Sequence, residues 1–265
     1  MSPPCPVSDP IDIAALRAAG FAAVEVLAEA ESTMERAREL AAVADCPLPA
    51  AVIADRQTRG RGQRGARWWQ PPGSLAVSIV LAADAGPPPP TWSLACGVAL
   101  AETLRGIEPA VPAVVRWPND VEVAGRKLAG ILVETVAGGR AIFGIGLNTT
   151  GTAADAPAPI AARVATLPDL VGAPLPRTPL LAAFLPRFER LLADMAADPA
   201  VLVARYRPLC GLDGEVVTIH AAARHHGICR GIAADGGLVL DTAEGRRQFA
   251  SGSLTDPATV WRGDG

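Results

Sequence analysis

The sequence lacks the features that mark membrane, secreted, zinc-binding or dedicated nucleic-acid-binding proteins. No run of about 18 apolar residues occurs, which excludes a typical membrane-spanning helix. The first residues also lack the basic and apolar pattern of a secretion signal. The five cysteines include no Cys-x-x-Cys pair, and the three histidines complete no zinc spacing with them. With 24 basic and 27 acidic residues there is no basic excess. We therefore expect a soluble protein of a reducing compartment, the cytoplasm.

Lysine is almost absent as well. Of the 24 basic residues, 23 are arginine and one is Lys127. This pattern indicates a compositional bias that exchanged lysine for arginine wherever either would serve, with chance survival of one lysine as the alternative. Because a compact ammonium and a planar guanidinium are not equivalent in a tight site, we favour a functional reason for Lys127.

The periodicity of apolar residues predicts a chain of both helices and strands. Ser32 and Glu35 have the spacing of a capping box, which predicts that a helix begins at Ser32. The helices are expected near 33–44, 92–106, 180–196 and 200–207, and the strands near 21–28, 51–55, 74–82, 114–117, 121–123, 128–136 and 141–147. Residues 152–176 are expected to be a loop with at most one short helix.

The texture of the sequence changes after Cys210-Gly211. Four short strands, separated by Gly and Asp turns and spaced about ten residues apart, indicate a small barrel. We therefore predict a larger domain at 1–209 and a smaller C-terminal domain at 210–265.

Residues 57–69 form a glycine- and arginine-rich segment, called here the glycine–arginine loop. Its Gly-x-Gly-x-x-Gly run does not indicate a dinucleotide site, because no helix of useful length can follow it. Glycine hinges and guanidinium groups suit a mobile clamp for carboxylate or phosphate. A solvated or nucleic-acid-binding loop is the alternative, but the preceding strand and Trp68-Trp69 favour a lid over a site. The arginines of this region are Arg56, Arg59, Arg61, Arg64 and Arg67.

A second group of motifs surrounds Lys127. Pro118-Asn119-Asp120 alone is only a turn signal. Gly144 and Gly146 alone are equally typical of a strand that another backbone approaches closely, and Asn148 alone is equally typical of a cap on that strand. The single lysine lies between these features and adds weight to a functional interpretation.

Together and in this order, the motifs resemble those of biotin protein ligases, enzymes that attach biotin to acyl-carrier domains. The family pattern is Ser-Thr-Asn at a helix start, Gln before Gly-Arg-Gly-x-x-Gly and a Trp, then Lys-Trp-Pro-Asn-Asp, Arg-Lys-x-x-Gly-Ile-Leu and Gly-x-Gly-x-Asn. The counterparts here are Ser32-Thr33, Gln57, 60–65, Trp68, 117–120, 126–132 and 144–148. The resemblance runs from about residue 25 to 255. It implies an α+β fold with a mixed sheet like that of class II aminoacyl-tRNA synthetases, flanked by helices, and a C-terminal SH3-like β-barrel.

The resemblance also implies roles for individual residues. Lys127 and Arg61 would be catalytic, and magnesium would lie near the ATP phosphates with Asp120 as a candidate ligand. The implied biotin-binding residues are Ser32, Thr33, Gln57, Gly60, Arg61, Gly62, Gln63, Lys127, Gly130, Gly144 and Gly146. The implied ATP-binding residues are Arg61, Arg64, Trp68, Asn119, Asp120, Lys127 and Asn148.

Three residues depart from the family pattern. Met34 replaces Asn, which would alter contacts to the ureido group of biotin. Arg116 replaces Lys and keeps the charge. Gln63 stands where many relatives have a basic residue, which would weaken retention of the intermediate.

The implied reaction activates biotin with ATP as biotinyl-5'-AMP and transfers it to a lysine of a biotin carboxyl carrier domain of a carboxylase. Lys127, Arg61, Arg64 and magnesium would offset the charge as a carboxylate approaches a phosphate. The glycine–arginine loop would then close over the intermediate and exclude water. No carboxylate or histidine stands out as general base, so this role stays open.

Two alternatives accompany this interpretation. A lipoate or octanoate protein ligase of the same fold is the first, and the loop and the Trp-Pro-Asn-Asp turn favour biotin. A nucleic-acid-binding regulator is the second. Only about 30 residues precede Ser32, whereas a helix-turn-helix module with its packing helices needs about 60, so we expect no DNA binding. We expect no membrane partner and leave a homodimer open.

Overall fold

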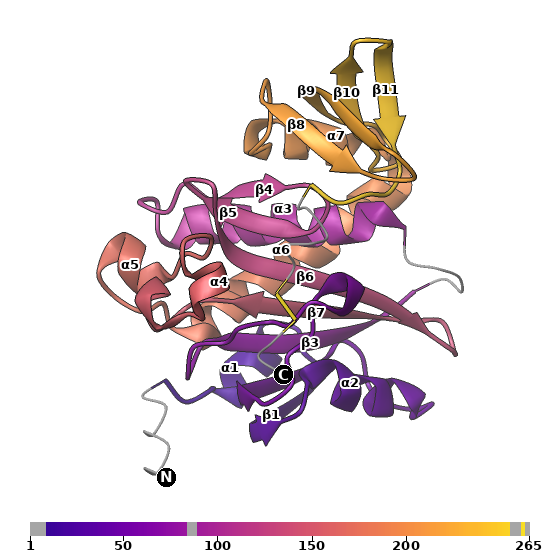
Figure 1. Ribbon diagram of the computed structural model, residues 1–265. Helices are drawn as coiled ribbons and strands as arrows, with labels where there is room; N and C mark the ends of the chain where they lie inside the picture. Colours follow the sequence, from indigo (N-terminus) through magenta and orange to yellow (C-terminus); the bar gives the residue numbers. More distant parts are fainter. Residues whose placement is uncertain (1–8, 84–88, 255–260, 263–265) are drawn as a thin grey trace.

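The computed structural model describes residues 9–83, 89–254 and 261–262 (Figure 1). Seven strands form one mixed sheet in the order β1-β2-β3-β7-β6-β5-β4. The pair β1 and β2 is parallel, and all other neighbours in this sheet are antiparallel. The strands are β1 Ala23–Ala30, β2 Ala50–Gln57, β3 Leu75–Ala82, β4 Val114–Arg116, β5 Asp120–Val123, β6 Arg126–Val136 and β7 Arg140–Leu147.

Helices cover both faces of this sheet. The α-helices are α1 Ile13–Ala18, α2 Thr33–Ala42, α3 Pro90–Ile107, α4 Ala158–Ala161, α5 Leu167–Val171, α6 Arg177–Ala197 and α7 Ala200–Tyr206. The short 3-10 helices are η1 Gln63–Gly65, η2 Ala153–Asp155 and η3 Arg207–Leu209. This arrangement confirms the expected α+β class, with a mixed sheet between helices.

The apolar strand β2 is buried on both faces of the sheet. Its residues alternate between the faces because successive strand side chains point in opposite directions. Ala51 and Ile53 belong to the large core cluster, which includes residues of α3 and α6. Ala50 and Val52 belong to a smaller cluster with Met34 of α2 and other residues. A strand buried on both faces therefore needs the continuous apolar run that the sequence has.

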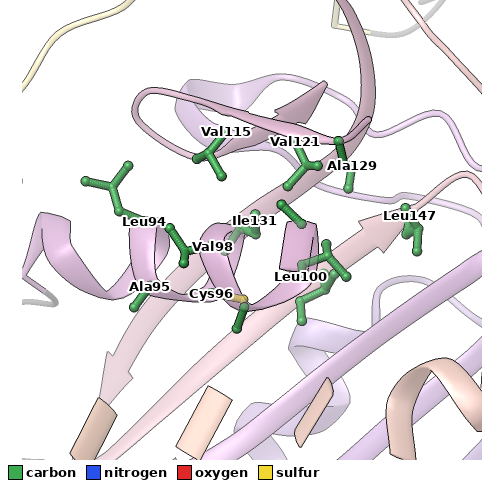
Figure 2. Close-up of a cluster of buried hydrophobic side chains, with 14 of the residues drawn as sticks. Leu94, Ala95, Cys96, Val98, Leu100, Val115, Val121, Ala129, Ile131 and Leu147 are labelled. Atoms are coloured by element: carbon green, nitrogen blue, oxygen red, sulfur yellow. The ribbon is translucent and has the colours of Figure 1, made fainter. Parts of the chain in front are cut away.

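The long helix α3 supplies much of the larger core. Figure 2 shows side chains of this helix facing residues of β4 to β7. Most of its length is buried, because it lies between the sheet and α6. The labelled residues of this cluster are Leu94, Ala95, Cys96, Val98, Leu100, Val115, Val121, Ala129, Ile131 and Leu147.

Two local predictions need correction. Helix α2 begins as predicted, with Ser32 Oγ accepting a hydrogen bond from the backbone N–H of Met34 at 3.3 Å. The capping box is incomplete, however, because the Glu35 carboxylate forms an ion pair with Arg61 of the glycine–arginine loop.

Residues 152–176 contain η2, α4 and α5 rather than a loop with one helix. N-cap hydrogen bonds stabilise such short helices; for example, Thr166 Oγ1 accepts a hydrogen bond from the backbone N–H of Asp169. Helices this short have too few residues for apolar periodicity to predict them.

The C-terminal part forms a second, antiparallel sheet in the order β11-β10-β9-β8, as expected for a small β unit (Figure 1). Its strands are β8 Val216–His220, β9 Arg224–Ile232, β10 Leu238–Thr242 and β11 Gly245–Phe249. Trp117 Nε1 donates to Gly236 O at 3.0 Å and Gly211 N donates to Val115 O at 3.0 Å, which attaches this sheet beside β4. The two sheets also share the large core cluster.

Candidate active site

A cavity of about 380 Å³ lies where α2, the glycine–arginine loop, β5 to β7 and the C-terminal segment meet. Its volume is that of a typical small-molecule site. All but one of the residues implied by the motifs line it, although they come from segments spread over more than a hundred positions. They are Ser32, Thr33, Gln57, Arg61, Gly62, Gln63, Arg64, Trp68, Asn119, Asp120, Lys127, Gly130, Gly144, Gly146 and Asn148.

The exception is Gly60, which lies at the neck of the glycine–arginine loop. Its carbonyl accepts a hydrogen bond from Trp68 N at 3.0 Å. A methyl group on Gly60 would lie 3.0 Å from Trp68 O and 3.3 Å from the Gln57 amide nitrogen. Gly60 therefore allows the two ends of the loop to meet, and the structure does not place it on the cavity wall.

One end of the cavity presents fixed polar groups. The Thr33 N–H donates to Gln57 Oε1 at 2.9 Å, and Thr33 Oγ1 contacts the same oxygen at 3.3 Å. Ser78 Oγ donates to Thr33 Oγ1 at 2.8 Å, a contact that no sequence motif indicated. Ser32 is buried beside them as the N-cap of α2. These polar groups are held in place by their hydrogen bonds before a ligand binds. This end of the cavity therefore suits a polar group of a ligand that has both hydrogen-bond donors and acceptors.

The glycines of β6 and β7 make room on the floor of the cavity. A methyl group on Gly144 would lie 2.6 Å from Met34 Sδ, and one on Gly146 would lie 2.6 Å from the Trp68 indole nitrogen. On Gly130 it would lie 3.0 Å from Lys127 Cε. Side chains at these positions would displace the walls of the slot. The neighbours that require the glycines are Met34, Trp68 and Lys127.

Lys127 stands at the centre of the charged part of the cavity. Its Nζ lies 2.7 Å from Asp120 Oδ1 and 5.7 Å from the centroid of the Trp68 ring. Its backbone is fixed at both polar atoms, because Lys127 N donates to Arg163 O and Lys127 O accepts from Ala165 N, each at 2.8 Å. The single lysine is thus placed beside a carboxylate and over an aromatic ring, within reach of an anionic ligand.

Glu122 is a charged residue of the cavity that the sequence interpretation missed. It lies two positions after Asp120 on β5 and is only 8% exposed. Burial raises the pKa of its carboxyl, while Arg116, with Nε 3.6 Å from Glu122 Oε1, acts in the opposite direction. The period-two spacing from Asp120 is a signal that could have indicated it.

Two asparagines and one tryptophan complete this part of the wall. Asn119 Nδ2 donates to Ile131 O at 2.8 Å, and Asn148 Nδ2 donates to Ala165 O at 2.9 Å. Among the described residues, Asn148 Oδ1 and Trp68 Nε1 are buried without a hydrogen-bond partner. Buried polar atoms usually have partners, so an acceptor and a donor on this wall are available to a ligand.

The arginines of the loop region are engaged with protein groups. Arg56 and Glu29, Arg59 and Glu31, and Arg61 and Glu35 form exposed ion pairs with β1 and the α2 region. Arg64 Nη2 donates to Gly252 O at 2.7 Å. An anionic ligand would therefore have to compete with Glu35 for Arg61, an exchange that costs little because exposed pairs are weak.

The C-terminal part contributes a wall that no motif indicated. The lining residues from this part are Gly252, Ser253, Leu254 and Trp261.

The described part of the chain contains no group of three or more His, Cys, Asp and Glu side chains that could hold a metal on their own. No helix in the described ranges is long and apolar enough to cross a membrane.

Comparison with known proteins identifies the family to which this chain is similar. The biotin/lipoate A/B protein ligase family matches residues 26–148, and the biotin protein ligase C-terminal domain matches residues 214–253. The biotin–[acetyl-CoA-carboxylase] ligase of Paracoccus denitrificans is 31% identical over 231 residues, which cover 84% of this chain and 95% of the relative. The chain belongs to the biotin protein ligase family.

Two other members of the biotin protein ligase family are similar to this chain in sequence or in structure. The biotin–[acetyl-CoA-carboxylase] ligase of Mycobacterium tuberculosis is 33% identical over 198 residues, with 72% of each chain covered. The biotin protein ligase of Aquifex aeolicus, solved in complex with biotin and ATP, superimposes with a TM-score of 0.75 at 27% identity. That match covers 88% of this chain and 97% of the other.

Proposed function

We propose that this protein is an ATP-dependent ligase that converts biotin to biotinyl-5'-AMP and transfers biotin to a lysine of a biotin carboxyl carrier domain of a carboxylase. One observation carries the proposal. A single cavity combines a fixed polar end, a glycine-floored slot and a lysine beside buried polar atoms without partners. The names of the relatives support the same reaction.

The cavity suggests how the substrates lie. Thr33 and Gln57, with Ser32, would contact the ureido end of biotin, and the slot over Gly144 would take its rings. The carboxylate would then reach Lys127 and, once released from Glu35, Arg61. Trp68, Asn119, Asp120 and Asn148 would contact the nucleotide. Each of these residue roles is part of the proposal.

The chemistry requires an anion to approach a polyanion. The biotin carboxylate attacks the α-phosphate of ATP, a mixed anhydride forms and pyrophosphate leaves. Lys127 would stabilise the charge that gathers between carboxylate and phosphate, because a fixed ammonium in a water-poor site acts without reorganisation. Arg61 and Arg64 would add charge from the loop while excluding water from the anhydride.

Magnesium fits the donor set of the cavity. Mg²⁺ is usually held by one or two carboxylates together with substrate phosphates. Asp120, with Glu122 two residues further along β5, supplies such carboxylates on the cavity wall. When bound, the ion would neutralise phosphate charge, and Lys127 would then exchange Asp120 for the substrate.

The proposal extends to organisation and location. We propose a catalytic domain at 1–209 and a C-terminal domain at 210–265, supported by the separate sheets. We also propose a cytoplasmic location, supported by the need for ATP and by four cysteines that are free: Cys46, Cys96, Cys210 and Cys229.

The test is transfer of labelled biotin to a purified carrier domain. Label should appear on the carrier only when ATP and magnesium are both present, and a carrier whose acceptor lysine is changed to arginine should stay unlabelled. Labelled lipoate and octanoate, offered at the same concentration, separate the rival substrates. Transfer of lipoate in preference to biotin, or no ATP-dependent transfer at all, would contradict the proposal.

A further inference from the structure

Trp261 and Arg262 lie against the glycine–arginine loop. The Arg67 N–H donates to Trp261 O at 3.1 Å, and Arg262 Nη1 donates to Arg64 O at 3.1 Å. Figure 1 shows this short yellow stretch apart from the four-stranded sheet. Both bonds use the backbone of the loop, so they hold its course whatever the arginine side chains bind.

The closeness of this contact depends on a glycine. A methyl group on Gly65 would lie 2.9 Å from Arg262 Nη1, and Gly65 has a φ of +76°, which a side chain would strain. Arg64 on the same turn also binds Gly252 O. The loop is therefore tied to the C-terminal part at two places, 252 and 261–262.

Trp261 also lines the cavity, and its indole N–H is buried without a hydrogen-bond partner among the described residues. Leaving a buried donor unpaired is unfavourable, so such a group in a cavity wall indicates a ligand acceptor.

The position of Trp261 identifies which half of the ligand it would meet. On β7, Gly144 faces Met34 of α2, whereas Gly146, two residues nearer Asn148, faces Trp68. The backbone of Trp261 is bonded to Arg67, the residue before Trp68. Trp261 therefore approaches the cavity beside Trp68, on the side proposed for the nucleotide.

We propose that Trp261 is a further ligand-binding residue, whose indole N–H donates to the nucleotide half of biotinyl-5'-AMP while 261–262 hold the loop over the ligand. This inference rests on the proposed function. It goes beyond the family resemblance, because the matched family regions, 26–148 and 214–253, do not include these residues.

Two substitutions separate the hydrogen bond from the packing of the ring. Trp261→Phe keeps an aromatic ring and removes the donor, whereas Trp261→Ala removes both. Trp92→Phe is the matched control, because Trp92 belongs to α3 and does not line this cavity. The measurements are KM for ATP and for biotin in pyrophosphate release, and the rate at which labelled biotinyl-5'-AMP leaves the enzyme.

Loss of one hydrogen bond should raise KM for ATP and the release rate of the adenylate roughly three- to tenfold in Trp261→Phe. Trp261→Ala should exceed this, because the loop also loses a packing partner. KM for biotin and the thermal midpoint of Trp261→Phe should match the parent, as should both KM values and the adenylate release rate of Trp92→Phe.

Three outcomes would overturn the inference. The first is parental adenylate release in both Trp261 variants. The second is slower release in Trp261→Ala, which would mean that the ring occupies the place of the ligand. The third is an equal change in both KM values. Failure of the proposed function is a separate result, because the unaltered enzyme would then form no labelled adenylate from biotin and ATP.

Discussion

Substituting Gly146 by alanine tests the floor of the cavity at its tightest point. The new methyl group would lie 2.6 Å from two atoms of the Trp68 indole, whereas ordinary contacts begin at 3.4 Å. The ring would have to retreat by close to an ångström. Because a misplacement of about 1 Å in a site can cost about a hundredfold in rate, we expect kcat/KM for adenylate formation to fall by that order.

The assay is pyrophosphate release with biotin and ATP, together with thermal unfolding to show that the variant is folded. Gly106→Ala is the matched control, because a methyl group there meets nothing within 4 Å near the end of α3. That control should keep parental activity and gain about 0.5–1 kcal/mol in stability, since alanine suits a helix better than glycine. A folded Gly146→Ala enzyme with parental kcat/KM would refute the reasoning about the Trp68 wall.

Three further predictions concern charged groups. Lys127→Arg keeps the charge, but a planar guanidinium cannot take the place of an ammonium 2.7 Å from Asp120 Oδ1, so pyrophosphate release should fall about a hundredfold. Near-normal release would discredit the role of Lys127. Arg61→Ala leaves Glu35 without its partner and should increase leakage of biotinyl-5'-AMP, measured as biotin appearing on bulk protein. Unchanged leakage would count against a retaining role. Because burial raises the pKa of Glu122, the folded state holds this proton more tightly than the unfolded state, and ionisation lowers stability as the pH rises through that folded-state pKa. Glu122→Gln should therefore show a smaller loss of thermal midpoint as the pH rises from the ordinary glutamate pKa of about 4.5 through the raised folded-state pKa, and an identical pH profile would contradict this assignment.

Much of the fold could be predicted because its signals are local. A Ser N-cap begins α2, turns separate β4 to β7, and Gly and Asp residues punctuate the C-terminal strands. The motifs also indicated the cavity wall, because the family resemblance linked segments that are far apart in the chain.

The remaining parts depend on contacts that a local pattern does not contain. Glu35 had two available partners, its own helix start and Arg61, and the distant guanidinium was favoured. Gly60 has the same sequence signature whether it touches a ligand or lets Trp68 pass, and the structure shows the second. Trp261 contacts a loop almost two hundred residues earlier, and nothing in its neighbourhood indicates this.

The placement of Lys127 makes amine-reactive reagents selective for one side chain of this protein. Apart from an α-amino group, these 265 residues contain a single primary amine, and it lies in the cavity at 2.7 Å from Asp120. Acylating reagents such as succinimidyl esters would thus modify one side chain, and bound ligand would shield it. Mass spectrometry of the labelled chain would then report occupancy directly. The same scarcity leaves an escaping mixed anhydride almost no amine on the enzyme itself, so amide-linked stray biotin would be found mainly on other proteins.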